Sequence, residues 1–236
     1  MEKTSYIVMF TLGMTILVAL MLSGLFYSTK DQAALNEAVF NKRAILSAIS
    51  DQLDKPVSDF TDEEVIAIFD KRMEQKVLDM EGDELEGVLA DDVDMKKEKK
   101  KPEAERILPL YIFNGDNEKI YIISVRGNGL WDEIWGNIAL KDDFNTVIGA
   151  AFDHQGETPG LGAEIKDNPS FAKQFKGKKI YRNGDYVSVN VRKGGARDMV
   201  HDVDGISGAT VTADGVDEML YRGIKYYEPY FSRAKG

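Results

Sequence analysis

The sequence contains no cysteine and only two histidines, His154 and His201. A chain without thiolates can neither ligate an iron–sulfur cluster through sulfur nor form a disulfide, and two separated histidines do not favour a transition-metal site. Neither histidine lies in a recognisable nucleophile motif, so the sequence does not indicate a Ser-His-Asp hydrolase. If the protein carries electrons, an organic cofactor must hold them.

Basic residues are also in the minority. The 236 residues include 30 Lys and Arg against 40 Asp and Glu, which gives a net charge of −10. Proteins that bind a phosphate backbone usually present a basic face, so we expect no nucleic-acid partner. The length is sufficient for one well-packed domain with additional segments.

Charged side chains are absent from residues 6–27, which are rich in Leu, Ile, Val, Met and Phe. A helix of this length extends roughly 33 Å, enough to cross a hydrocarbon core of about 30 Å. We therefore expect a transmembrane helix over 6–27, after an N-terminal tail over 1–5. A cleaved signal peptide is the alternative, although its apolar region is typically only about 7 to 15 residues long. The few flanking lysines and arginines lean slightly towards a cytoplasmic C-terminal domain.

We interpret residues 28–105 as a helical extension followed by a charged linker or insertion. The apolar pattern of 31–50 suits a helix that continues out of the bilayer, and a second helix is expected to start at Thr61, where Glu64 can complete a capping box. Its apolar face is predicted at Val65, Phe69, Met73, Val77 and Met80. Acidic residues between Glu81 and Asp94 precede a run of lysines, which is typical of a solvated, mobile segment rather than a lipid-binding one.

Residues 106–236 have the pattern of an α+β domain with a mostly antiparallel sheet. No regular alternation of strands with long helices occurs, and no G-x-G-x-x-G follows a strand, so a Rossmann domain is poorly supported. We expect a hairpin of Ile107–Phe113 and Lys119–Val125, further strands at Thr146–Phe152 and Tyr186–Arg192, and a short helix at Phe171–Lys176.

The most informative stretch is Asp204 to Thr212, which reads Asp-Gly-Ile-Ser-Gly-Ala-Thr-Val-Thr. Small residues leave the backbone bare just before Thr210, and a helix is predicted to follow. Its apolar stripe comprises Val216, Met219, Leu220, Ile224 and Tyr227. Thr210 is therefore expected near a helix N-terminus, where free N–H groups favour phosphate. On its own, the string is more typical of a helix cap in a tight turn.

This stretch resembles the flavinylation motif D-G-x-[ST]-G-A-T of the FMN-binding subunits of two related membrane complexes. These are the NqrC subunit of the Na+-translocating NADH:quinone reductase and its counterpart in the Rnf complex. The resemblance implies that Thr210 carries FMN through a phosphoester bond to its hydroxyl, attached by a separate flavin transferase. It also implies a periplasmic FMN-binding domain over residues 106–236. Thr212 and Ser207 are the alternative acceptors, and Asp204, Gly208 and Ala209 complete the expected loop.

Three other stretches resemble segments of the same family. The run Gly156-Glu-Thr-Pro-Gly-Leu-Gly162 predicts a type II turn and a backbone that a flat ligand can approach. In the family it lines the flavin, which implies polar contacts from Glu157 and Thr158, an apolar wall from Leu161, and close approach at Gly160 and Gly162. Gly127-Asn-Gly-Leu-Trp131 is similar to G-x-G-L-W, so Leu130 and Trp131 are expected beside the ring. In Val191–Ala196, Lys193 is either a phosphate partner or a solvated charge.

The resemblance implies an electron-carrying subunit of a bacterial inner-membrane complex that couples electron transfer from NADH to quinone to sodium export. Its expected partners are the other subunits, the flavin transferase and membrane lipid; no metal and no catalytic side chain are expected. The helical extension and the Lys-Gly-Gly-Ala sequence at 193–196 favour the quinone reductase over the Rnf complex. A membrane-anchored binding or sensor module without redox activity is the alternative from another class.

Overall fold

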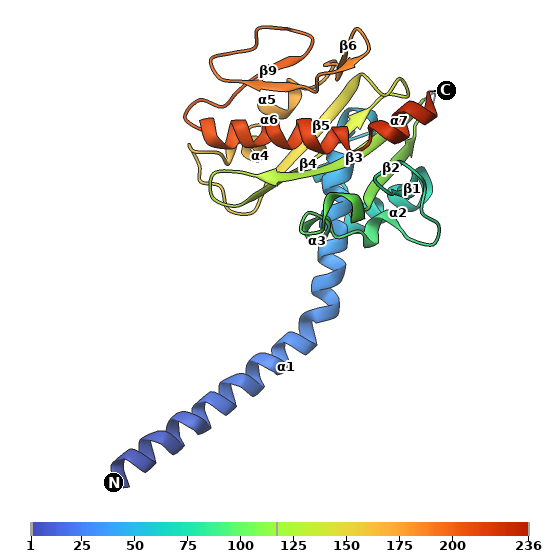
Figure 1. Cartoon of the computed structure of the whole chain (residues 1–236). Helices are drawn as coiled ribbons and strands as arrows, with labels where there is room; N and C mark the ends of the chain where they lie inside the picture. Colours follow the sequence, from blue (N-terminus) through green and yellow to red (C-terminus); the bar gives the residue numbers. More distant parts are fainter. Residues whose placement is uncertain (1, 117, 236) are drawn as a thin grey trace. The chain divides into compact units, whose positions relative to one another are not determined.

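The computed structural model describes residues 2–116 and 118–235. The chain divides into two compact units, Met1–Asn41 and Lys42–Gly236. Helix α1 spans Glu2–Ser47 (Figure 1); its residues up to Asn41 belong to the first unit and its last residues, from Lys42, to the second. The helix thus continues past the apolar segment, as the pattern of residues 31–50 predicts.

Helix α1 is long and apolar enough to cross a membrane. Its most apolar stretch has a mean hydropathy of 2.2, and none of that stretch is buried against the rest of the chain. The hydroxyls of Thr11 and Thr15 donate to the carbonyls of Ile7 and Thr11, at 2.9 and 2.8 Å. These polar groups are therefore satisfied within the helix, as a lipid environment requires.

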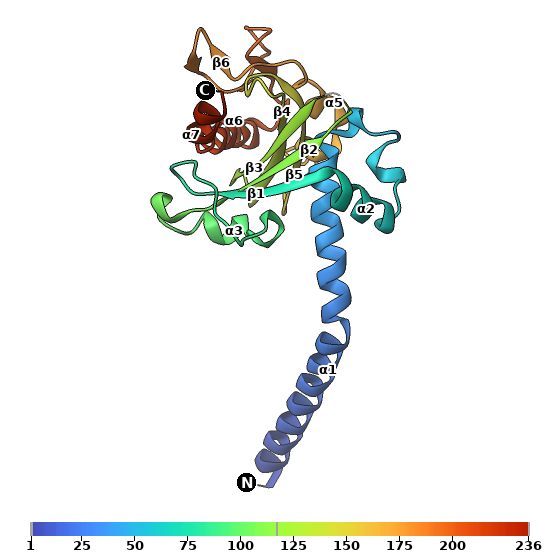
Figure 2. The same ribbon diagram turned by 90° about the vertical axis from the view of Figure 1, so that its right-hand side faces the viewer.

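The second unit is built on a five-stranded antiparallel sheet with the order β1-β2-β3-β4-β5 (Figures 1 and 2). The strands are β1 Met73–Leu78, β2 Leu108–Asn114, β3 Lys119–Asn128, β4 Glu133–Leu140 and β5 Val147–His154. Two smaller pairs are antiparallel β6 Tyr181–Arg182 with β7 Asp185–Tyr186, and parallel β8 Asn190–Arg192 with β9 Asp202–Asp204. The predicted α+β class and the mostly antiparallel sheet are confirmed.

Six α-helices and four short 3₁₀ helices complete the described part of this unit. The α-helices are α2 Asp62–Arg72, α3 Met95–Glu98, α4 Glu164–Asp167, α5 Pro169–Lys173, α6 Thr210–Lys225 and α7 Glu228–Ala234. The 3₁₀ helices are η1 Ser50–Gln52, η2 Val57–Asp59, η3 Ala90–Asp92 and η4 Glu103–Glu105.

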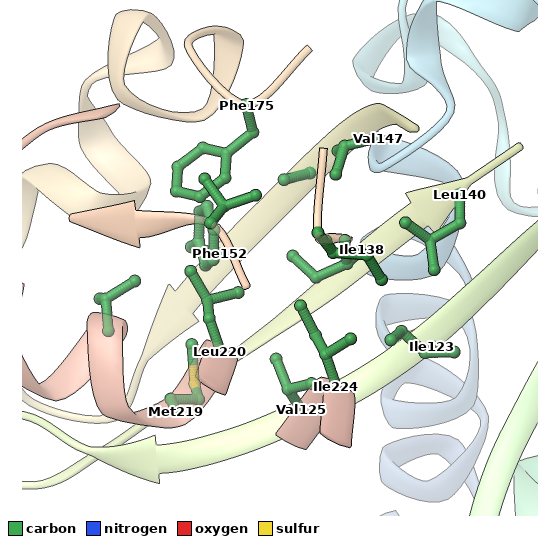
Figure 3. Packing of buried hydrophobic residues seen from close by; sticks show 14 of the residues in the cluster. Ile123, Val125, Ile138, Leu140, Val147, Phe152, Phe175, Met219, Leu220 and Ile224 are labelled. Carbon is green, nitrogen blue, oxygen red and sulfur yellow. The ribbon is translucent and has the colours of Figure 1, made fainter. Parts of the chain in front are cut away.

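The core lies between one face of the sheet and helix α6. The five residues predicted as the apolar stripe of that helix are all buried: Val216, Met219, Leu220, Ile224 and Tyr227. Figure 3 shows Leu220 pointing towards Phe152 of the sheet and Ile224 beside Val125, with Phe175 beyond Phe152. Burial of such side chains contributes about 1.5–3 kcal/mol each, which makes this stripe the main attachment of the helix.

Helix α6 approaches strand β3 until the two backbones nearly touch. A Cβ atom added to Gly215 would lie 2.1 Å from the carbonyl oxygen of Asn128, and one added to Gly127 would lie 2.7 Å from Cβ of Met219. A Cβ on Gly223 would lie 2.5 Å from Val125. Glycine is therefore required along this contact, which fixes the position of α6 on the sheet.

The structure corrects the predicted second helix. The capping box is confirmed: the N–H of Glu64 donates to the Thr61 hydroxyl and the N–H of Thr61 donates to the Glu64 carboxylate. The helix ends at Arg72, however, and Met73–Leu78 forms strand β1 along the edge of β2. The helical spacing of its apolar residues was misleading because pairing with the free backbone edge of β2 outweighs local preference.

The charged segment after β1 is not a detached linker. Glu98 is buried and accepts from the N–H of Ile107 at 3.1 Å. The ammonium of Lys99 donates to the carbonyl of Gly127 at 3.1 Å and to the side chain of Asn128 at 2.5 Å. Most residues of this segment are exposed, as expected, but part of the lysine run is bonded to the end of β3.

The remaining strand predictions are mostly confirmed. Strands β2 and β3 form the expected hairpin, whose connection includes residue 117, which lies outside the described residues. Strand β5 and helix α5 occupy the other two predicted positions. The single strand predicted at 186–192 is wrong because Ser188 has a φ of 63°, which separates β7 from β8.

Candidate functional site

Thr210 is the first residue of helix α6, and the backbone just before it forms a tight turn. The N–H of Ala209 donates to the carbonyl of Ile206 at 3.2 Å, and Gly208 has a φ of 84°, which defines a type II turn. The N-cap residue, Ala209, makes no side-chain capping hydrogen bond. The first-turn N–H groups of this 16-residue helix therefore lack a side-chain cap and suit an anion.

The Glu157 carboxylate joins three of the predicted stretches. One oxygen, Oε1, accepts from the N–H groups of Trp131 at 2.9 Å and Asp132 at 3.3 Å. The other, Oε2, accepts from the N–H of Leu130 at 3.2 Å and from the Thr212 hydroxyl at 2.5 Å. The structure thereby brings the Gly-Leu-Trp segment, the Gly-rich loop and the first turn of α6 into one site.

These bonds also determine the protonation of Glu157, whose side chain is only 5% exposed. Burial raises its pKa, but the hydrogen bonds from Thr212 and from the N–H groups of Trp131, Asp132 and Leu130 outweigh burial and lower the pKa below its ordinary value. Glu157 is therefore a charged group at neutral pH, held by donors of the protein.

The Gly-rich loop has the predicted type II turn. The N–H of Leu161 donates to the carbonyl of Thr158 at 2.9 Å, and Gly160 has a φ of 81°. The Glu164 carboxylate accepts from the N–H groups of Gly160 and Gly162. A Cβ on Gly208 would lie 3.0 Å from the carbonyl oxygen of Gly160, so this loop is in close contact with the turn before Thr210.

Four exposed apolar side chains belong to these joined segments. Trp131 is 66% exposed, Val211 54%, Leu161 42% and Leu130 36%. Large apolar side chains left exposed on adjoining segments are typical of a ligand or partner surface. Together with the uncapped helix terminus, they fit a ligand that combines a flat apolar ring with a phosphate, as FMN does.

The segment that contains Lys193 adjoins the start of the Thr210 loop. The N–H of Gly205 donates to the carbonyl of Arg192 at 2.8 Å, and the N–H of Ala196 donates to the Asp204 carboxylate at 2.7 Å. Lys193 is exposed and has no ion pair within residues 2–116 and 118–235. Its ammonium is therefore available to an anion at this edge of the site.

Gln174 is a structural contributor that sequence reasoning missed. Its side-chain oxygen accepts from the N–H of Asp204 at 2.8 Å, and its side-chain nitrogen lies 3.5 Å from the carbonyl oxygen of the same residue. It thus fixes the first residue of the Thr210 loop. No local pattern could have indicated this, because an isolated glutamine after a short helix is an ordinary surface residue.

The structure separates the predicted site residues into two groups. Thr210, Ser207, Gly208, Thr158 and Gly160 are at least partly exposed. Ala209, Gly162, Glu157 and Thr212 are buried. Direct polar contact between Glu157 and a ligand was expected, but both carboxylate oxygens already accept two hydrogen bonds each from the protein. The buried Thr212 hydroxyl is also engaged, which disfavours Thr212 as an acceptor.

The sequence and fold place this chain in a known class. An FMN-binding domain model matches residues 129–225, which include Leu130, Trp131, the Gly-rich loop, Lys193 and Thr210. The fold and the site therefore define an FMN-binding domain.

The particular family follows from relatives that match more of the chain. A protein of Pseudomonas aeruginosa is 31% identical over 246 aligned positions, which cover 93% of this chain and 91% of the relative. A protein of Haemophilus ducreyi is 41% identical over 116 positions, so that match spans about half of either chain, 48% and 45%. Both are named as the NqrC component of the Na(+)-translocating NADH-quinone reductase.

A solved structure agrees with these relatives. The crystal structure of the same component from Parabacteroides distasonis superimposes with a TM-score of 0.76 at 35% identity, covering 86% of this chain and 96% of that one. The chain belongs to the NqrC family of the Na(+)-translocating NADH-quinone reductase.

Proposed function

We propose that the protein is the electron-carrying subunit of a Na+-translocating NADH:quinone reductase and holds FMN covalently through a phosphoester to Thr210. The observation that carries this proposal is the position of Thr210: it is partly exposed, follows a turn of small residues, and begins a helix whose N-terminus has no side-chain cap. Bound FMN would supply the one- and two-electron redox chemistry.

Each part of the site would have a defined task. The Thr210 hydroxyl provides the ester oxygen, and the first-turn N–H groups and Lys193 offset the negative charge that a phosphodiester retains. Leu130, Trp131 and Leu161 provide apolar surface for the ring. Attachment through the phosphate leaves the ring edge accessible, which suits a carrier that passes electrons between other centres during NADH-to-quinone electron transfer coupled to sodium export.

The anchor and the partners belong to the same proposal. Helix α1 would span the bacterial inner membrane once, with the FMN domain on the periplasmic side, in contact with lipid and with the other subunits of the complex. A flavin transferase would be needed during maturation. Protease treatment of spheroplasts should cleave the FMN domain from outside, and a domain that remains uncut would reverse the orientation. Co-purification should recover the other subunits.

The decisive experiment is intact mass and peptide mapping of the full-length chain, expressed with and without a flavin transferase. We expect the mass increase of one FMN less one water only with the transferase, yellow colour that survives acid precipitation, and modification at Thr210. Thr210→Ala should be colourless yet folded, because the side chain is partly exposed, whereas Ser207→Ala should keep its flavin. An unmodified Thr210 in the wild-type chain, whether expressed with the transferase or isolated from the native membrane, would overturn the proposal.

A further inference from the structure

Both carboxylate oxygens of Glu157 accept hydrogen bonds from groups of the protein itself. Its two oxygens accept from three consecutive N–H groups, those of Leu130, Trp131 and Asp132, and from the hydroxyl of Thr212. Its own N–H donates to Nδ1 of His154 at 3.1 Å. A carboxylate with four donors has little capacity left to bond a ligand. Glu157 therefore acts on the site by holding the segments that donate to it.

Two glycines beside this carboxylate, Gly129 and Gly162, leave no room for a larger side chain at their positions. A Cβ atom on Gly129 would lie 2.6 Å from Oε1 of Glu157. A Cβ on Gly162 would lie 2.5 Å from Oε2 and 2.3 Å from the Thr212 hydroxyl oxygen. Both glycines belong to motif segments, and both leave room for the carboxylate and the hydroxyl. The Glu157 carboxylate is therefore closely packed between these two glycines inside the site.

The same contact distinguishes two threonines that are only two residues apart. Thr212 is fully buried, and its hydroxyl donates to Glu157 at 2.5 Å and lies 3.2 Å from the carbonyl of Leu161. Thr210 is partly exposed at the start of the same helix. A modifying enzyme can reach the first hydroxyl and not the second.

We infer that Glu157 is the positioning residue of the flavin site. By holding the Thr212 hydroxyl it limits ester formation to Thr210, and by holding residues 130–132 it fixes the exposed side chains of Leu130 and Trp131 against the first turn of α6. The ring of an attached flavin would thereby pack against Leu130 and Trp131 in one fixed arrangement. This inference rests on the proposed attachment of FMN to Thr210.

The test uses the full-length chain expressed with the flavin transferase. Thr212→Val removes the hydroxyl at nearly constant volume, Thr212→Ser retains it, and Glu157→Gln replaces one acceptor oxygen with a donor. The matched control is Thr146→Val, because the Thr146 hydroxyl also donates to a carboxylate, that of Asp143 at 2.6 Å, outside the flavin motifs. The readouts are the attachment site by peptide mapping, the visible circular dichroism of the flavin, and its midpoint potential.

We expect Thr212→Val and Glu157→Gln to keep FMN on Thr210 but to lose visible dichroism and to shift the midpoint potential, because the Leu130–Trp131 segment is no longer fixed. Thr212→Ser and Thr146→Val should both keep the dichroism and the midpoint potential of the wild type. Thr210→Ala should carry no flavin on Thr212.

The outcomes separate the two proposals. A wild-type chain without covalent FMN overturns the proposed function together with this inference. Wild-type flavin on Thr210, combined with unchanged dichroism and potential in Thr212→Val and Glu157→Gln, overturns the inference alone. So does an equal change in Thr146→Val, or FMN on Thr212 in Thr210→Ala. If Thr212→Val fails to fold, Glu157→Gln and Thr212→Ser provide the same comparison.

Discussion

Replacing Gly208 with alanine should reduce flavin attachment by more than its effect on stability explains. The φ of Gly208 is 84°, a conformation that costs an L-residue about 1–2 kcal/mol. For a chain of this size, 1 kcal/mol lowers the melting temperature by about 2–4 °C, so strain alone predicts a decrease of about 2–8 °C. The new Cβ would also lie 3.0 Å from the carbonyl oxygen of Gly160, which forces the two loops apart. Because Thr210 follows two residues later, its hydroxyl would be displaced.

Gly177→Ala is the matched control for this prediction. Gly177 has a φ of 81°, and a Cβ there would meet no atom within 4 Å, so this variant carries the strain without the collision. Both variants should melt at a lowered temperature, Gly208→Ala at least as low as Gly177→Ala, while covalent flavin per chain should fall only in Gly208→Ala. Full flavin occupancy in Gly208→Ala, or an equal loss of flavin in both variants, would refute the assigned contact between the loops.

Two further predictions concern pH and the core. The lowered pKa of Glu157 means that its charge stabilises the fold above the ordinary glutamate pKa, and that this contribution is lost as pH falls from about 4.3 through the lower folded value. The difference in denaturation midpoint between wild type and Glu157→Gln should therefore shrink with acidification; a constant difference would contradict the assignment. Tyr227→Phe should destabilise by about 1–3 kcal/mol, because the fully buried hydroxyl donates to the carbonyl of Pro109 at 2.9 Å and lies 3.2 Å from that of Ser124. Denaturant titration measures this loss, and an unaltered midpoint would disprove the bond's contribution.

The parts of the site that could be predicted from sequence are those encoded by neighbouring residues. The turn before Thr210 and the helix after it follow from small residues and a regular apolar stripe, and the turn at Gly160 follows from a Pro-Gly pair. The role of Glu157 could not be foreseen in this way, because its donors at Leu130–Asp132 and Thr212 come together only after the sheet and α6 have packed. The same holds for Gln174.

Two errors in the fold have equally physical causes. Strand β4 was missed because Gly136 and Asn137 disfavour strands locally; in the folded chain, a Cβ on Gly136 would lie 2.7 Å from the ring of Phe152. Strand β1 was read as helix because its apolar spacing fits a helical period. In both segments the tertiary environment decides the conformation, through the packing of an aromatic ring in one and the pairing of an open sheet edge in the other.

The near-contact of α6 with β3 has a mechanical consequence. Side chains can change rotamer and so absorb movement, but at Gly215 the helix backbone lies directly against the backbone of Asn128, with no side chain between them. The backbone at the start of α6, which includes Thr210, is consequently held close to the sheet. If FMN is attached as proposed, movement of its ring relative to the sheet must arise from rotation about the bonds beyond the Thr210 backbone.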